Sequence, residues 1–93
     1  MTVKLTKWDS ADHLKTKEDV AAYLEAVFED GDSTLITHAL GVVARAEGMT
    51  EVARQTGLTR ASLYKALSNN GNPEFSTVLK VVHALGLKMT VEA

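Results

Sequence analysis

Residues 56–67, TGLTRASLYKAL, predict the end of one short helix, a tight turn and the start of a second helix. Gly57 suits the left-handed backbone that ends a helix, and Thr59 suits the cap of the helix that follows. Leu63 and Leu67 lie four residues apart, so they share the buried face of the second helix. Two short helices joined by a turn with glycine are typical of the helix-turn-helix.

Apolar residues at spacings of three and four predict helices on both sides of this motif. The five predicted helical ranges are 17–29, 34–47, 51–56, 60–68 and 77–85. The candidate N-cap residues are Thr16, Ser33, Thr50, Thr59 and Ser76. Their side-chain oxygens can accept hydrogen bonds from backbone N–H groups in the first helical turn. The chain is therefore expected to fold as a mostly α domain.

Residues 87–93 alternate between apolar and polar side chains, which is the period of a β-strand. A lone strand leaves backbone groups unpaired, so we expect it to pair with another strand. The candidate partners are residues 2–6, TVKLT, and the same strand of a second chain, and we favour the second chain. The predicted homodimer contacts are Leu87, Lys88, Met89, Thr90 and Val91.

Length and composition favour a single soluble domain. Ninety-three residues divide into an arm and acidic helix (1–32), a helix-turn-helix region (33–86) and a strand (87–93), with the first part belonging to the same compact unit. The chain has no cysteine, which excludes disulfides. Its apolar runs are far shorter than the ~20 residues of a membrane span. We therefore expect a cytoplasmic protein that does not act at a membrane.

The net charge of −2 conceals an uneven distribution. Residues 1–32 hold four lysines and eight acidic residues. Residues 33–73, which include the predicted helix-turn-helix, hold four basic and two acidic residues. The acidity therefore belongs to the first third of the chain, and the middle is mildly basic.

The exposed side of the predicted second helix is the candidate surface for double-stranded DNA. In DNA-binding helix-turn-helix proteins this helix enters the major groove. Arg60 can contact a guanine edge, and Ala61 can contact a thymine methyl group. The Ser62 hydroxyl can act as a hydrogen-bond donor or acceptor to a base. The candidates for contacts nearer the phosphates are Thr50, Thr59, Tyr64, Lys65, Asn69 and Asn70. The alternative is a protein-interaction module that uses this face only for packing.

The sequence shows no pattern for catalysis or for holding a metal. His13, His38 and His83 are widely separated, and no nucleophile elbow or phosphate-binding loop accompanies the acidic residues. We therefore expect no catalytic, metal-binding or cofactor-binding residue, no small-molecule substrate and no enzymatic activity.

Three segments carry a resemblance to a known family. They are DVAAYLEAV (19–27), HALGVVARAEGMTEVARQTGLTRASLYKALS (38–68) and GNPEFSTVLKVVHALGLKMTV (71–91). The chain resembles the HigA-like antidote proteins of addiction modules, which carry an Xre/Cro-type, lambda-repressor-like helix-turn-helix. The resemblance implies a cytoplasmic antitoxin that represses its own operon and neutralises a RelE-like ribonuclease toxin. It also implies base reading at the start of the second helix, Thr59 to Ser62.

Three points stay open beside this resemblance. Some phage repressors carry a glutamine pair where this chain has Arg60 and Ala61, so the operator sequence does not carry over. A free-standing phage-like repressor without a toxin would share the same motif. If there is a toxin, its expected positive charge favours the acidic helix, and the candidate contacts are Glu18, Glu25 and Glu29. The alternative is that these three are ordinary solvated positions.

Overall fold

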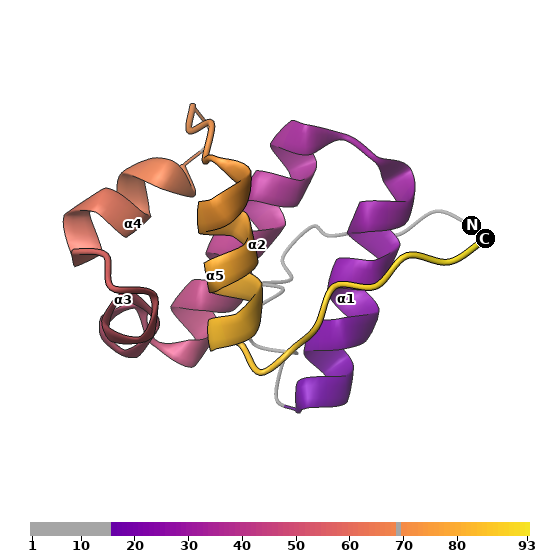
Figure 1. Cartoon of the computed structure of the whole chain (residues 1–93), viewed down its shortest axis with the longest axis horizontal. Coiled ribbons are helices and arrows are strands. Elements are labelled where there is room, and N and C mark those ends of the chain that lie inside the picture. The colour runs from indigo at the N-terminus through magenta and orange to yellow at the C-terminus, as the bar shows by residue number, and fades with distance from the viewer. Residues whose placement is uncertain (1–15, 69) are drawn as a thin grey trace, which may run out of the picture.

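Five helices make up the regular structure of residues 16–68 and 70–93, the part of the chain that the computed structural model describes. They are α1 (Lys17–Asp30), α2 (Ser33–Glu47), α3 (Met49–Thr56), α4 (Arg60–Ala66) and α5 (Phe75–Ala84). In Figure 1, α1 and α4 lie at opposite ends of the molecule, with α2 and α5 between them. The mostly α fold predicted from the sequence is confirmed.

The first two helices begin at acidic or hydroxyl caps. The Thr16 hydroxyl accepts a hydrogen bond from the Asp19 amide at 3.0 Å, and the Asp19 carboxylate accepts one from the Thr16 amide at 3.3 Å. This reciprocal capping box starts α1 at the predicted position. The cap of α2 is Asp32 rather than Ser33, because its carboxylate accepts from the Thr34 and Leu35 amides at 2.9 and 3.2 Å. A charged acceptor makes the stronger hydrogen bond.

The remaining predicted boundaries shift by about two residues. Thr50 was expected to cap α3, but the helix starts at Met49, two residues earlier than expected, because Met49 is buried in the core. Thr50 therefore lies in the first turn. Likewise, α5 begins at Phe75 rather than after Ser76. Helix α4 ends at Ala66, two residues before its expected end at residue 68. Gly71 of the following loop packs against the last carbonyl groups of this helix. A Cβ on Gly71 would lie 2.3 Å from the Ala66 oxygen.

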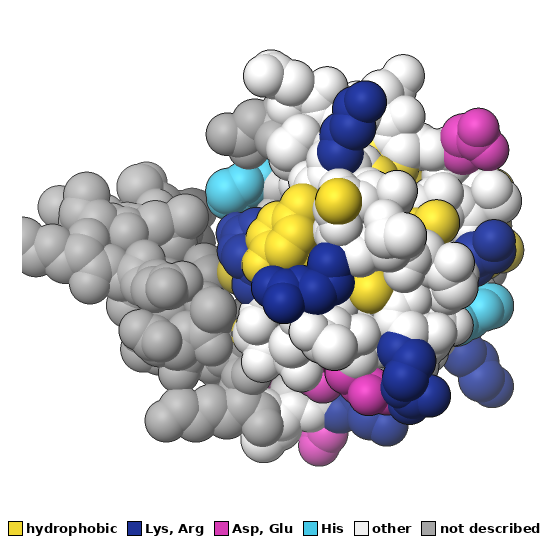
Figure 2. Space-filling model, turned by 90° about the vertical axis from the view of Figure 1, so that its left-hand side faces the viewer, with side chains coloured by type: hydrophobic (Ala, Val, Ile, Leu, Met, Phe, Trp, Pro, Cys, Tyr) yellow, Lys and Arg dark blue, Asp and Glu magenta, His cyan; other side chains and the backbone are white. Residues whose placement is uncertain are grey.

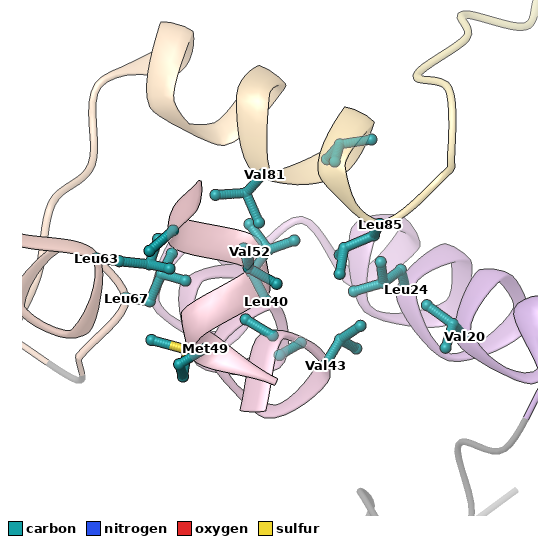
Figure 3. Packing of buried hydrophobic residues seen from close by; sticks show 14 of the residues in the cluster. Val20, Leu24, Leu40, Val43, Met49, Val52, Leu63, Leu67, Val81 and Leu85 are labelled. Atoms are coloured by element: carbon teal, nitrogen blue, oxygen red, sulfur yellow. The ribbon is translucent and has the colours of Figure 1, made fainter. Parts of the chain in front are cut away.

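One apolar core joins all five helices. Its fully buried side chains include Leu40 and Val43 of α2, Val52 of α3, Leu63 of α4 and Val81 of α5. The inner face of α1 adds the side chains of Val20, Leu24 and Val27. In Figure 3 these side chains converge between α1 on one side and α4 on the other. The core therefore fixes α3 and α4 relative to the rest of the chain.

Residues 87–93, called the tail below, do not form the predicted strand. The Leu87 amide donates to the Val82 carbonyl at 3.2 Å, and the chain then runs beside α1 without regular structure (Figure 1). A strand requires a ladder of hydrogen bonds to a neighbouring strand, and residues 16–68 and 70–93 contain no strand. The predicted arm, residues 2–6, lies outside the described residues.

Candidate nucleic-acid interface

The turn between α3 and α4 is fixed by hydrogen bonds that converge on one carbonyl. Gly57 has φ of 77°, a left-handed conformation that glycine adopts without a Cβ penalty. Its amide and that of Leu58 donate to the Ala53 oxygen at 3.0 and 3.2 Å. The buried Thr56 hydroxyl donates to the same oxygen at 3.0 Å. The predicted turn at Gly57 is confirmed, and it holds α4 at a defined angle to α3.

At the start of α4, two hydroxyl groups bond to each other. The Thr59 oxygen accepts from the Ser62 amide at 3.0 Å, which confirms Thr59 as the cap. The Thr59 hydroxyl in turn donates to the Ser62 oxygen at 2.9 Å. The Ser62 hydroxyl hydrogen therefore points elsewhere, and it can donate to a group approaching from solvent.

The buried and exposed faces of α4 separate as the sequence predicted. Leu63 has no exposed surface and Leu67 is 3% exposed, so both anchor the helix in the core. The outward side chains are those of Arg60, Ala61, Ser62, Tyr64 and Lys65. Figure 2 looks onto this end of the molecule and shows lysine and arginine side chains around an apolar patch, with acidic side chains mainly along one margin.

Arg60 and Tyr64 form a contact that the sequence interpretation missed. The Arg60 guanidinium carbon lies 5.7 Å from the centre of the Tyr64 ring, and one of its nitrogens is 3.5 Å from the phenol oxygen. An arginine above an aromatic face gains a cation–π attraction. The signal was present, because residues four apart in a helix are neighbours. The contact places the Arg60 guanidinium beside the Tyr64 side chain on the exposed face of α4.

Local ion pairing decides which positive charges remain available on this face. The Glu51 carboxylate accepts hydrogen bonds from Arg54 at 3.1 Å and from Gln55 at 2.7 Å. The hydrogen bond from Arg54 is the main cause that lowers the pKa of Glu51, and the same bond raises the pKa of Arg54. The positive charge of Arg54 is therefore matched by an ion pair within α3. The positive charges of α4 come from Arg60 and Lys65.

The other predicted contact residues are spread more widely. Thr50 is exposed in the first turn of α3, and Asn70 is exposed in the loop after α4, whereas Asn69 lies outside the described residues. The acidic side chains expected to contact a toxin, Glu18, Glu25 and Glu29, are all exposed on α1. They lie at the end of the molecule opposite α4 (Figure 1).

Residues 16–68 and 70–93 contain no group of three or more histidine, aspartate or glutamate side chains arranged to hold a metal ion. Over the same ranges, none of the helices has both the length and the apolar character needed to cross a membrane.

Comparisons with known proteins relate nearly the whole chain to one family. A family model described as "Probable addiction module antidote protein" matches residues 4–93. A protein of Haemophilus influenzae (strain KW20 / Rd), itself named only as uncharacterized, is 45% identical over 92 residues. That alignment covers 99% of this chain and 95% of the relative. No solved structure matches the chain.

Proposed function

The chain belongs to the family of probable addiction module antidote proteins, and we propose that it is a HigA-like antitoxin whose α3–α4 pair is an Xre/Cro-type helix-turn-helix. In this proposal the pair binds the operator DNA of its own operon in the cytoplasm. The main support is that α4 has one buried and one exposed face. Leu63 and Leu67 are buried in the core, whereas Arg60, Ser62 and Lys65 are exposed. The three-residue turn fixes this presentation before DNA arrives.

The first turn of α4 supplies the base-reading groups. Arg60 offers a planar fork of donors that matches the O6 and N7 acceptors of guanine. The Ala61 methyl group is small enough for close contact with a thymine methyl group. Because Ser62 already accepts from Thr59, its hydroxyl is oriented to donate to a base acceptor. These three contacts would read neighbouring base pairs.

Groups farther along supply contacts to the phosphates. Lys65 is exposed one turn after Ala61, and Asn70 follows in the next loop. Thr50, in the first turn of α3, places a hydroxyl and nearby amides where that helix would meet the DNA backbone. Such contacts release counterions, so the affinity should fall steeply with salt concentration.

An antidote also requires a toxin partner, and we place that partner on α1. The exposed acids Glu18, Glu25 and Glu29 lie at the end opposite the DNA-binding helix. A RelE-like toxin acts on RNA and is expected to be basic, so complementary charge would guide the two proteins together. The proposed arrangement leaves α4 accessible when the toxin is bound.

Titration of the purified protein against DNA tests the DNA-binding half of the proposal. Fluorescence anisotropy would compare the fragment upstream of its own gene with a scrambled fragment of equal length. We expect tighter binding to the upstream fragment, with an affinity that falls as salt rises. Equal and weak binding to both fragments would instead favour the protein-interaction module.

Co-expression with the neighbouring reading frame tests the toxin half. An antitoxin should co-purify with the neighbouring product and relieve its inhibition of growth. If the protein binds its upstream fragment but no neighbouring product, it is a free-standing repressor of the phage type.

A further inference from the structure

The C-terminal end of α4 lies against two glycine residues from different parts of the chain. Gly41 is buried in the middle of α2, and Gly71 lies in the loop after α4. A Cβ on Gly41 would lie 3.0 Å from the Leu67 carbonyl oxygen. A Cβ on Gly71 would lie 2.7 Å from the Lys65 carbonyl oxygen and closer still to that of Ala66. A side chain at either glycine would therefore crowd the last carbonyl groups of the helix.

Neither glycine is explained by its own backbone conformation. The glycines with positive φ among the described residues are Gly31, Gly48, Gly57 and Gly86, and the two that lie against α4 are not among them. In the interior of a helix, glycine is also less favourable than alanine, because it loses more backbone freedom on folding. The close approach of α4 is thus what the glycine of α2 permits.

We propose that Gly41 and Gly71 are positioning residues for DNA recognition, which act by setting where the C-terminal end of α4 lies. This inference rests on the proposed binding of DNA by α4 and concerns the placement of that helix. The other end of α4 is fixed by the turn at Gly57 and by the Thr59 cap. With the first turn held, a movement of the last turn tilts the whole helix and its exposed side chains.

A side chain at position 41 would move α4 rather than α2. The residues beside Gly41 on α2 that have no exposed surface are Ala39, Leu40, Val43 and Ala44. The core therefore holds α2 over a broad face, whereas α4 has seven residues and is anchored by Leu63 and Leu67. An Arg45 guanidinium nitrogen would also lie 3.2 Å from the added Cβ, but this exposed and flexible side chain can turn aside.

The expected movement is small but matters for reading bases. In Gly41→Ala, the Leu67 oxygen must withdraw by a few tenths of an ångström. Because the seven residues of α4 span about 10 Å, the helix should tilt by about 2°. Gly41→Val adds two more carbon atoms and should tilt it further. Phosphate contacts fix the protein on the duplex, so a tilted α4 would misplace Arg60 against the guanine edge.

Two DNA titrations for each variant test the proposal. Fluorescence anisotropy at one salt concentration would measure affinity for the upstream fragment and for a scrambled fragment of equal length. The ratio of the two affinities should fall about threefold in Gly41→Ala and about tenfold in Gly41→Val, tenfold being the size of one lost base contact. Gly71→Ala should lower the ratio as well. A merely unstable variant would lose affinity for both fragments equally, so its ratio would not change.

Residual dipolar couplings of the backbone amides, measured without DNA, would report the orientation of α4 relative to α2. The angle should change in Gly41→Ala and change further in Gly41→Val. Alanine is the better helix former, so Gly41→Ala should stay folded even if the larger valine does not. Ala46→Val is the matched control, because it places valine at an exposed position of the same helix. It should alter neither the angle nor the ratio of affinities.

An unchanged angle in the folded Gly41 variants would overturn the proposal, and so would an unchanged ratio of affinities in a variant whose α4 is tilted. A wild type that binds both fragments equally would instead refute the proposed function, and the role in recognition with it. The dipolar couplings need no DNA, so they distinguish these two failures.

Discussion

Replacing Arg60 with alanine should weaken operator binding and relax the preference at one base pair. A bidentate arginine–guanine contact contributes roughly 1–3 kcal/mol of discrimination. In the unbound protein, however, the Arg60 guanidinium lies 5.7 Å from the Tyr64 ring centre. An exposed cation–π contact contributes about 0.5–1 kcal/mol, and it is lost if the arginine moves to the base. With the middle of each range, the net loss should be about 1.3 kcal/mol, or roughly eightfold in affinity.

Two matched variants separate base reading from general charge. Lys65→Ala, on the same helix, should weaken binding to all sequences evenly and reduce the salt slope by about 0.9. Lys17→Ala removes the same charge from α1, at the far end of the molecule, and should change little. Anisotropy titrations at one fixed salt concentration, against the operator and each single base-pair variant of it, would measure all three.

The pattern of losses decides the assignment. If Arg60→Ala keeps both its affinity and its base preference, Arg60 does not contact a base. If the variant loses affinity equally for every sequence, the arginine contacts phosphate, and the proposed reading of guanine is wrong. Either result would move base recognition to other residues of α4.

Three further predictions follow from burial and charge. Leu63→Ala, at a side chain with no exposed surface, should lower the free energy of unfolding by roughly 2–5 kcal/mol in denaturant titrations, and a loss under 1 kcal/mol would contradict its place in the core. Changing Glu18, Glu25 and Glu29 together to glutamine should preserve DNA binding but slow toxin association at low salt in stopped-flow measurements; unchanged rates would remove α1 from that interface. Because its arginine partner lowers the pKa of Glu51, the small stabilisation from this pair should be present above the ordinary pKa of 4.5 and be lost as the pH falls below it. In Glu51→Gln, the free energy of unfolding should therefore fall less steeply as the pH drops below 4.5. An unchanged pH dependence would show that the exposed pair contributes nothing measurable.

Local sequence signals were sufficient for the helices and for the two faces of α4. The leucine spacing placed Leu63 and Leu67 in the core, and Gly57 and Thr59 marked the turn and the cap. These features depend on residues within one or two helical turns of each other. The Arg60–Tyr64 contact is equally local and could have been predicted from its spacing of four.

Features that depend on distant packing were not predictable in this way. Burial of Met49 in the core moved the start of α3. The tail shows the same limit, because its alternation indicates a strand, whereas residues 87–93 run beside α1 without regular structure.

The net charge of −2 does not oppose DNA binding, because the charges that matter are separated in space. The acidic residues of α1 and the outward residues of α4 lie at opposite ends of a molecule whose longest extent is 38 Å (Figure 1). At physiological ionic strength exposed charges are screened beyond about 8 Å. DNA bound at α4 would therefore interact mainly with Arg60 and Lys65, and a basic toxin at α1 mainly with the acids. One small chain can thus present opposite charges to two partners without either surface cancelling the other.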